Sequence, residues 1–329
     1  MSRSRYASPV FRWAPGEGPD AEALARLQRR FPRPRVPMGD AWFMGDERCM
    51  YTSLLSPDPT TWSCDDLRGA LWALASGPGS FGYMREWSLW FPYLVHAALP
   101  FVEGPAFLDS EYGVLVSAVM VHCPDPDASP HGEGFIDDVL LTLGRMPMMD
   151  VCWDERRWTS RNAFPAVEHT VHGWVLSGRG NLHAACTLLA RYLDEVSLDA
   201  WLASTLDIDD SLWRAGMVSW LAHVVPLLED PSRWPAALDI GPGSWDASHC
   251  VTGRTPEGQG DAVSGPFPFF DPSRRVALCA AVRRHASRSR LRAWGVALQA
   301  LPGEPGQWSG VCTDYVAACR RIIAAYALE

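Results

Sequence analysis

An apolar stripe with helical spacing follows Asp209 and Asp210, and it is the strongest constraint on the fold. Five small or apolar residues recur every four positions along it: Leu212, Gly216, Trp220, Val224 and Leu228. Residues at this spacing share one face of an α-helix, whereas a β-strand would place neighbouring residues on opposite faces. The stripe therefore predicts a long helix that packs its apolar face against a core.

Other segments carry similar patterns. Helices are predicted over residues 21–30, 67–76, 84–99, 182–196, 274–286 and 290–301, followed by a terminal helix with Val311, Tyr315, Ile322 and Tyr326 on one stripe. We expect Asp20 and Asn181 to cap the helices that follow them, and Ser197 to cap a further short helix. Residues 112–122 are rich in Val and fit either a buried strand or a helix, and residues 41–55 fit an edge strand. The chain is therefore predicted to be mainly α-helical, with a small β element in its N-terminal third.

Two short sequence motifs each occur twice in the chain, which is a weak indication of an internal repeat. Leu74-Ala75-Ser76 recurs as Leu202-Ala203-Ser204, and Tyr93-Leu94-x-His96 is echoed by Trp220-Leu221-x-His223. Each block is a short predicted helix followed by a longer one, as in the stacked helix hairpins of HEAT-like α-solenoids. We predict stacked helix hairpins. No known repeat consensus is satisfied.

Composition divides the chain into three parts. Residues 230–272 contain seven Pro and many Gly with almost no periodic apolar pattern, so they are predicted to be a long loop or linker. The aromatic residues Phe267, Phe269 and Phe270 in this segment predict that it packs against the rest of the protein. Residues 1–229 then form a helical body with a basic N-terminal arm, and residues 273–329 form a C-terminal three-helix segment.

The chain contains no lysine, which excludes several kinds of chemistry. All 29 positive side chains are arginine. A phosphate-binding P-loop, a pyridoxal phosphate enzyme and a Ser-Lys hydrolase each require a lysine. The nine cysteines are scattered without a C-x-x-C pair, which fits a reducing cytoplasm, and no apolar run is long enough to span a membrane.

Charge is unevenly distributed. Residues 36–272 hold 12 Arg against 32 acidic residues, whereas residues 273–292 hold seven Arg and no acid. The seven candidate anion-binding or partner-binding arginines are Arg274, Arg275, Arg283, Arg284, Arg288, Arg290 and Arg292. Nucleic acid is an unlikely partner, because the acidic body repels phosphate. We expect these arginines to find an intramolecular partner on the acidic face.

A metal site is the leading enzymatic alternative. His169 and His172 lie three residues apart beside Glu168, and on a helix both imidazoles would face one side. His183, Asp138 or His122 would complete the shell. The acidic doublets 65–66, 137–138 and 209–210 superficially resemble terpene synthase motifs but lack the required continuation, so they are interpreted as helix starts.

The sequence thus favours recognition over catalysis. No complete catalytic motif is present in it, and no cofactor is expected. Sixteen Trp residues and an acidic helical body suit a protein that binds another protein, most plausibly a cationic one. A bacterial immunity-type protein that neutralises a toxin is our specific hypothesis. The alternatives are a metal-dependent enzyme centred on His169 and His172, and a nucleic-acid adaptor that uses the basic helices.

Overall fold

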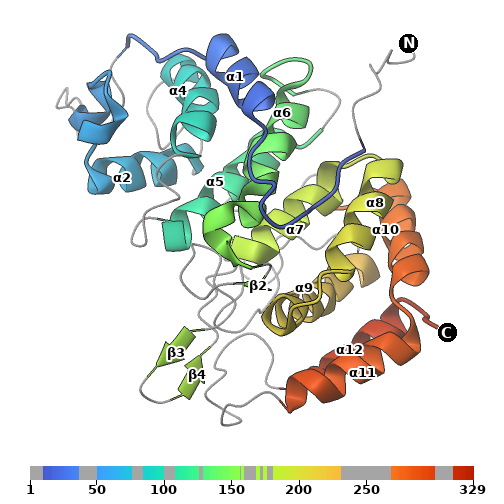
Figure 1. The fold of residues 1–329 in the computed structure, drawn as a ribbon. Coiled ribbons are helices and arrows are strands. Elements are labelled where there is room, and N and C mark those ends of the chain that lie inside the picture. The colour runs from blue at the N-terminus through green and yellow to red at the C-terminus, as the bar shows by residue number, and fades with distance from the viewer. Residues whose placement is uncertain are drawn as a thin grey trace, which may run out of the picture.

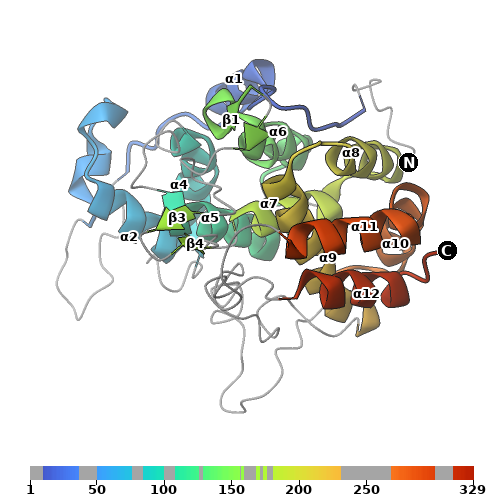
Figure 2. The ribbon, with the colours of Figure 1, turned by 60° about the horizontal axis from the view of Figure 1, so that its bottom comes forward.

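The computed structural model shows a mainly α-helical protein, which confirms the predicted fold class. It describes residues 10–36, 50–75, 84–99, 108–125, 129–155, 157–158, 168–170, 173–175, 181–230, 268–300 and 314–329. Figure 1 shows the helices gathered around a central helix, α7 (Asn181–Tyr192), with α2 (Cys64–Ala75) at one end and the C-terminal helices at the other. Figure 2 shows the same separation after a 60° turn.

Five helices are described in the N-terminal half. They are α1 (Ala21–Arg30), α2, α4 (Met84–Ala97), α5 (Leu108–His122) and α6 (Phe135–Thr142). Helix α1 packs against α4 and α6, and α2 packs against α5. The Val-rich segment left open between strand and helix is thus the second half of α5. Its residues Tyr112–Met120 are all buried, which explains why no single apolar face marked it as helical.

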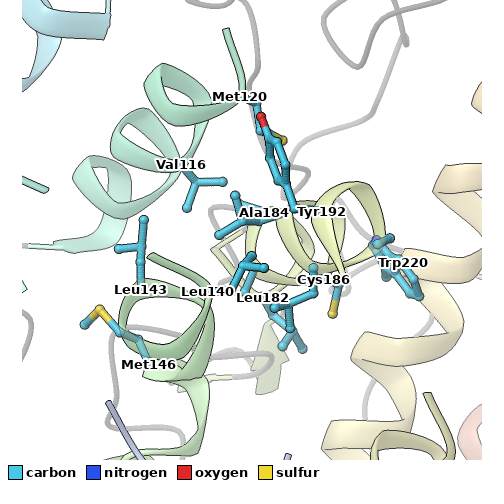
Figure 3. Packing of buried hydrophobic residues seen from close by; sticks show 14 of the residues in the cluster. Val116, Met120, Leu140, Leu143, Met146, Leu182, Ala184, Cys186, Tyr192 and Trp220 are labelled. Atoms are coloured by element: carbon cyan, nitrogen blue, oxygen red, sulfur yellow. The ribbon is translucent and has the colours of Figure 1, made fainter. Parts of the chain in front are cut away.

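Helix α7 is buried around its whole circumference and contacts α5, α6 and α9 (Ser211–Glu229). Figure 3 shows side chains of α7 among those of neighbouring helices, with Ala184 beside Val116. Leu182 approaches α9, because a Cβ added at Gly216 would lie 2.7 Å from Leu182 Cδ2. A helix that is apolar on all sides is expected at the centre of a large core. The long helix predicted after Asp210 is confirmed as α9.

Four further helices complete the C-terminal half: α8 (Glu195–Leu206), α10 (Pro272–His285), α11 (Arg288–Gln299) and α12 (Tyr315–Ala325). Helix α10 packs on α8, α11 pairs with α12, and α12 packs on α9. Among the described residues, one apolar cluster contains side chains from Phe11 to Leu328, so these helices share the core of the body.

Acidic caps fix the starts of several helices. The side chains of Asp20, Asp194, Asp210, Asp271 and Asp314 each accept a backbone N–H in the first turn of the helix that follows. Such a bond satisfies one of the four unpaired donors at a helix start. The prediction for Asp20 is confirmed. The prediction that Ser197 caps a helix is wrong: α8 already begins at Glu195, and the N–H of Ser197 donates to Asp194 over 2.8 Å.

Strands are few among the described residues. Strands β1 (Trp153–Asp154) and β2 (Arg157–Trp158) pair antiparallel, as do β3 (Glu168–Thr170) and β4 (Gly173–Val175). Short 3₁₀ helices occupy Thr52–Leu55, Pro59–Thr61, Leu143–Met148 and Asp150–Cys152. The edge strand expected within 41–55 is partly outside the described residues, and its last four residues form the first of these 3₁₀ helices.

Contacts between tryptophan side chains join Trp13, which precedes α1, to α8 and α9. Trp213 of α9 contacts Trp13, Trp153 and Trp158 with ring centroids 4.9–5.5 Å apart, and Trp201 of α8 bridges Trp13 and Trp220. The indole N–H of Trp13 donates to the carbonyl of Gly144, and that of Trp213 donates to the carbonyl of Thr205, both over 2.9 Å. Edge-to-face contacts with satisfied indole N–H groups stabilise a buried core.

The predicted solenoid is not confirmed. In a solenoid each repeat contacts its sequence neighbours, whereas here α10 packs on α8 and α12 packs on α9. Most of residues 230–272 lie outside the described residues, but Phe269 and Phe270 are buried. Phe269 lies under the guanidinium of Arg191, 4.4 Å from ring centroid to Cζ. The division into three parts stays a prediction.

Candidate functional site

The arginine-rich helices α10 and α11 lie against acidic side chains of the body. Arg284 and His285, at the end of α10, both contact Oδ1 of Asp199 in α8, and the His285 Nε2–Asp199 distance is 2.9 Å. Arg290, in the first turn of α11, contacts Asp207 over 3.0 Å just after α8 ends. The carboxylates of Asp199 and Asp207 therefore neutralise part of the basic segment.

Three further arginines donate to backbone carbonyls. Arg275 donates to the carbonyl of Leu228 near the end of α9, and Arg283 Nε donates to the carbonyl of Tyr326 over 2.7 Å. Arg288 Nε donates to the carbonyl of Leu328 over 3.1 Å. The carbonyls at the end of a helix lack intrahelical partners and carry partial negative charge, so cations stabilise them.

Five of the seven candidate arginines are therefore engaged within the chain: Arg275, Arg283, Arg284, Arg288 and Arg290. Arg274 lies in the first turn of α10, where its backbone N–H donates to Asp271. Arg292 is exposed on α11. Of the five, Arg284 and Arg290 contact acidic side chains, as expected for pairing with the acidic face, and the other three contact backbone carbonyls.

Acidic residues face outward where the β1–β2 hairpin meets the turn between α8 and α9. The hairpin is held there because the N–H of Trp158 donates to Asp210 and because Trp153 and Trp158 both pack on Trp213. The exposed acids of this region are Asp150, Asp154, Glu155, Asp207 and Asp209, which we term the hairpin–turn acidic surface. Asp209 pairs with Arg214 over 2.7 Å, yet its side chain remains 89% exposed.

The two aspartates of the doublet 209–210 have different roles. Asp210 Oδ1 accepts the N–H of Trp213 over 2.8 Å and so caps α9, while Asp209 points to solvent. Asp65 and Asp66 lie in the first turn of α2, where Asp66 accepts the N–H of Ser53. These contacts agree with the interpretation of the doublets as helix starts.

The predicted histidine pair is only partly within the described residues. His169 lies in β3, in register with Trp174 of β4, and His172 falls outside the described residues. His169 is thus on a strand and not on the helix that the i,i+3 argument assumed. Whether the two imidazoles share an ion stays a prediction.

The residues expected to complete that shell have other neighbours. Asp138 in α6 is buried and pairs with Arg26 of α1 over 2.7 Å. Burial raises the pKa of Asp138, and the bond to Arg26 acts in the opposite direction. His122, at the end of α5, packs against Trp87 with ring centroids 4.6 Å apart. His183 in α7 packs against His223 of α9. Sequence reasoning did not pair these two histidines.

Buried thiols and histidines are held in their neutral forms. Burial raises the pKa of Cys123 and of Cys152 to about 12, so neither is a thiolate at neutral pH. Burial also lowers the pKa of His131 to about 4, and the nearby Arg30 acts in the same direction. Within the described ranges, no group of three or more His, Cys, Asp or Glu side chains is placed to hold a metal ion.

Comparisons with protein-family models, with curated proteins and with solved structures gave no significant match. The structure defines a mainly α-helical protein. No helix among the described residues is long and apolar enough to cross a membrane.

Proposed function

We propose that the protein is a non-catalytic recognition protein that binds a cationic protein partner through its acidic body. The observation that supports this best is the internal use of the arginine-rich helices. Five of their arginines contact carboxylates or carbonyls of the same chain. Residues 36–272 hold 12 Arg against 32 acidic residues, so acidic side chains are the charged groups that the body mainly offers to a partner.

The hairpin–turn acidic surface is the proposed contact region. Its exposed carboxylates stand on a rigid base, because Trp153, Trp158 and Trp213 pack together beneath the hairpin with ring centroids 4.9–5.3 Å apart. A rigid charged surface steers a partner of opposite charge and loses little conformational entropy on binding. Asp199 and Asp207 already pair with arginines of α10 and α11, which supports a partner that carries guanidinium groups.

A bacterial immunity-type role, in which the partner is a toxin, is the specific form of this proposal. The same charge distribution disfavours a nucleic-acid adaptor, because the acidic body, with 12 Arg against 32 acidic residues over 36–272, repels phosphate. Phosphate binding needs several cations on one face. A cationic protein therefore fits the surface better than a nucleic acid does.

The experiment is co-expression of the chain with the product of the adjacent reading frame. Stable co-purification of that product, weakened by moderate salt, is the expected result for an electrostatic complex. Failure of the two products to bind would reject the immunity form of the proposal. Binding of DNA or RNA at low salt would favour the adaptor instead.

A further inference from the structure

A buried histidine and a half-buried histidine from different helices have their rings in contact inside the body. His183 of α7 and His223 of α9 have ring centroids 5.1 Å apart, with planes inclined by 48°. His183 is 7% exposed and His223 is half-buried, so the pair has one deep and one accessible member. Gly216 allows the close approach of the two helices, because an added Cβ there would lie 2.7 Å from Leu182 Cδ2.

In each imidazole, one ring nitrogen hydrogen bonds to a backbone carbonyl of α9. Nδ1 of His223 lies 2.7 Å from the carbonyl oxygen of Ser219, and His183 hydrogen bonds to the backbone of Gly216. A neutral imidazole has one N–H and one lone pair, so the second nitrogen of each ring is an acceptor. Donation of the other N–H to a carbonyl is the arrangement that orients metal-binding histidines in proteins.

We propose that His183 and His223 together bind one divalent transition-metal ion of the zinc type. Two imidazoles that share a tetrahedral ion, with metal–nitrogen bonds of about 2.0–2.1 Å, have centroids about 5 Å apart. The observed separation of 5.1 Å matches this arrangement. Imidazole ligands select zinc, copper or nickel over magnesium or calcium, which prefer oxygen.

The surroundings limit the site to two protein ligands among the described residues. Cys186 lies one turn from His183, but burial keeps the pKa of its thiol high and its Sγ lies 3.8 Å from Met217 Sδ. Arg321 of α12 places a positive charge near His223, which opposes a cation. Water or an added ligand would fill the remaining positions, so the ion is bound by two imidazoles and stays open to exchange.

Zinc titration of the chelator-treated full chain tests the proposal. Calorimetry should detect one Zn²⁺ per chain, and Co²⁺ should give the visible absorption of a nitrogen-ligated ion. The substitutions His223→Gln and His183→Asn should each abolish stoichiometric binding. His96→Gln is the matched control, because His96 is also buried and its Nε2 lies 2.9 Å from a backbone carbonyl, that of Phe31. This control should bind zinc as the wild type does.

Three results would overturn the proposal: no binding by the wild type, unchanged binding in His223→Gln, or loss of binding only when His169 or His172 is replaced. His223 is half-buried, so its substitution decides the matter if His183→Asn fails to fold. The outcome is independent of partner binding at the hairpin–turn acidic surface.

Discussion

Trp13 lies edge-on against Trp213, with ring centroids 5.5 Å apart and planes inclined by 68°. This contact joins the segment before α1 to α9, the longest of the described helices. The backbone N–H of Trp13 also donates to Ser204 Oγ of α8 over 3.1 Å. Phe11 and Trp13 are therefore part of the core, although basic residues are what characterise this part of the sequence.

Truncation of this indole should strongly destabilise the protein. We expect Trp13→Ala to lower the free energy of unfolding by about 3–5 kcal/mol, because it leaves a large cavity and an unpaired Gly144 carbonyl. Urea unfolding followed by circular dichroism measures the change. Trp72→Ala is the control of the same residue type. Trp72 is 36% exposed, so its loss should be clearly smaller.

The doublet at the start of α9 allows a comparison between neighbours. Asp210→Ala removes the cap on Trp213 and the bond to the N–H of Trp158, and it should lower the free energy of unfolding by about 1–2 kcal/mol. Asp209→Ala removes only an exposed ion pair with Arg214 and should cost less than about 1 kcal/mol. Thermal unfolding measures the stability of the two variants. Equal losses of stability in both would contradict the capping argument.

Acid should destabilise the protein through His131. Its pKa is about 4 in the folded chain against an ordinary value of 6.5, so between these values the unfolded chain binds more protons. Stability is therefore fully present above about pH 6.5 and is lost as the pH falls toward 4.

Replacing His131 should weaken this pH dependence. Its ring lies among Phe31, Phe91 and Phe135 with centroids 4.8–6.2 Å away, so His131→Phe keeps an aromatic ring at the site. Urea midpoints measured at several values between pH 4 and pH 7 should then change less than in the wild type. An unchanged pH slope would show that His131 does not contribute to it.

The pairing of α10 with α8 should depend on salt. Asp199→Asn removes the charge that Arg284 and His285 share, and it should lower the free energy of unfolding by about 0.5–1 kcal/mol at low salt. The loss should shrink at high salt, where exposed charges are screened. Glu195→Gln, on the exposed surface of the same helix, should have little effect under either condition. Hydrogen exchange in α10 would localise the change.

Periodicity was sufficient to predict where most helices lie. The patterns of α10, α11 and α12 gave their positions because each helix has one face on the core. The stripe of α9 was recognisable although Ala215–Ala222 are buried on every side. Periodicity was insufficient for α5, where Tyr112–Met120 are buried on every side and carry no polar face. The cap of α8 was misplaced because Asp194 and Ser197 are both good capping residues, and only geometry distinguishes them.

The candidate sites show a different limit of sequence reasoning. From charge composition we expected the arginines of 273–292 to pair with an acidic face, and Arg284 and Arg290 do so, whereas Arg275, Arg283 and Arg288 contact backbone carbonyls that composition does not reveal. Composition did not identify which acids remain exposed, since that depends on the hairpin packing against Trp213. The pairing of His183 with His223 was missed because the two residues lie on separate helices, and no local spacing marks a contact between helices.

The most direct test of the recognition proposal is calorimetric titration of the adjacent gene product into the wild-type chain and into the double variant Asp154→Asn, Glu155→Gln. Neutralising Glu22 and Glu133 instead, at other exposed positions, provides the charge-matched control. We predict tight binding by the wild type and by the control, and weaker binding by the hairpin variant. Equal affinities for all three proteins would contradict the assignment of the hairpin–turn acidic surface, and no binding at all would contradict the proposed partner.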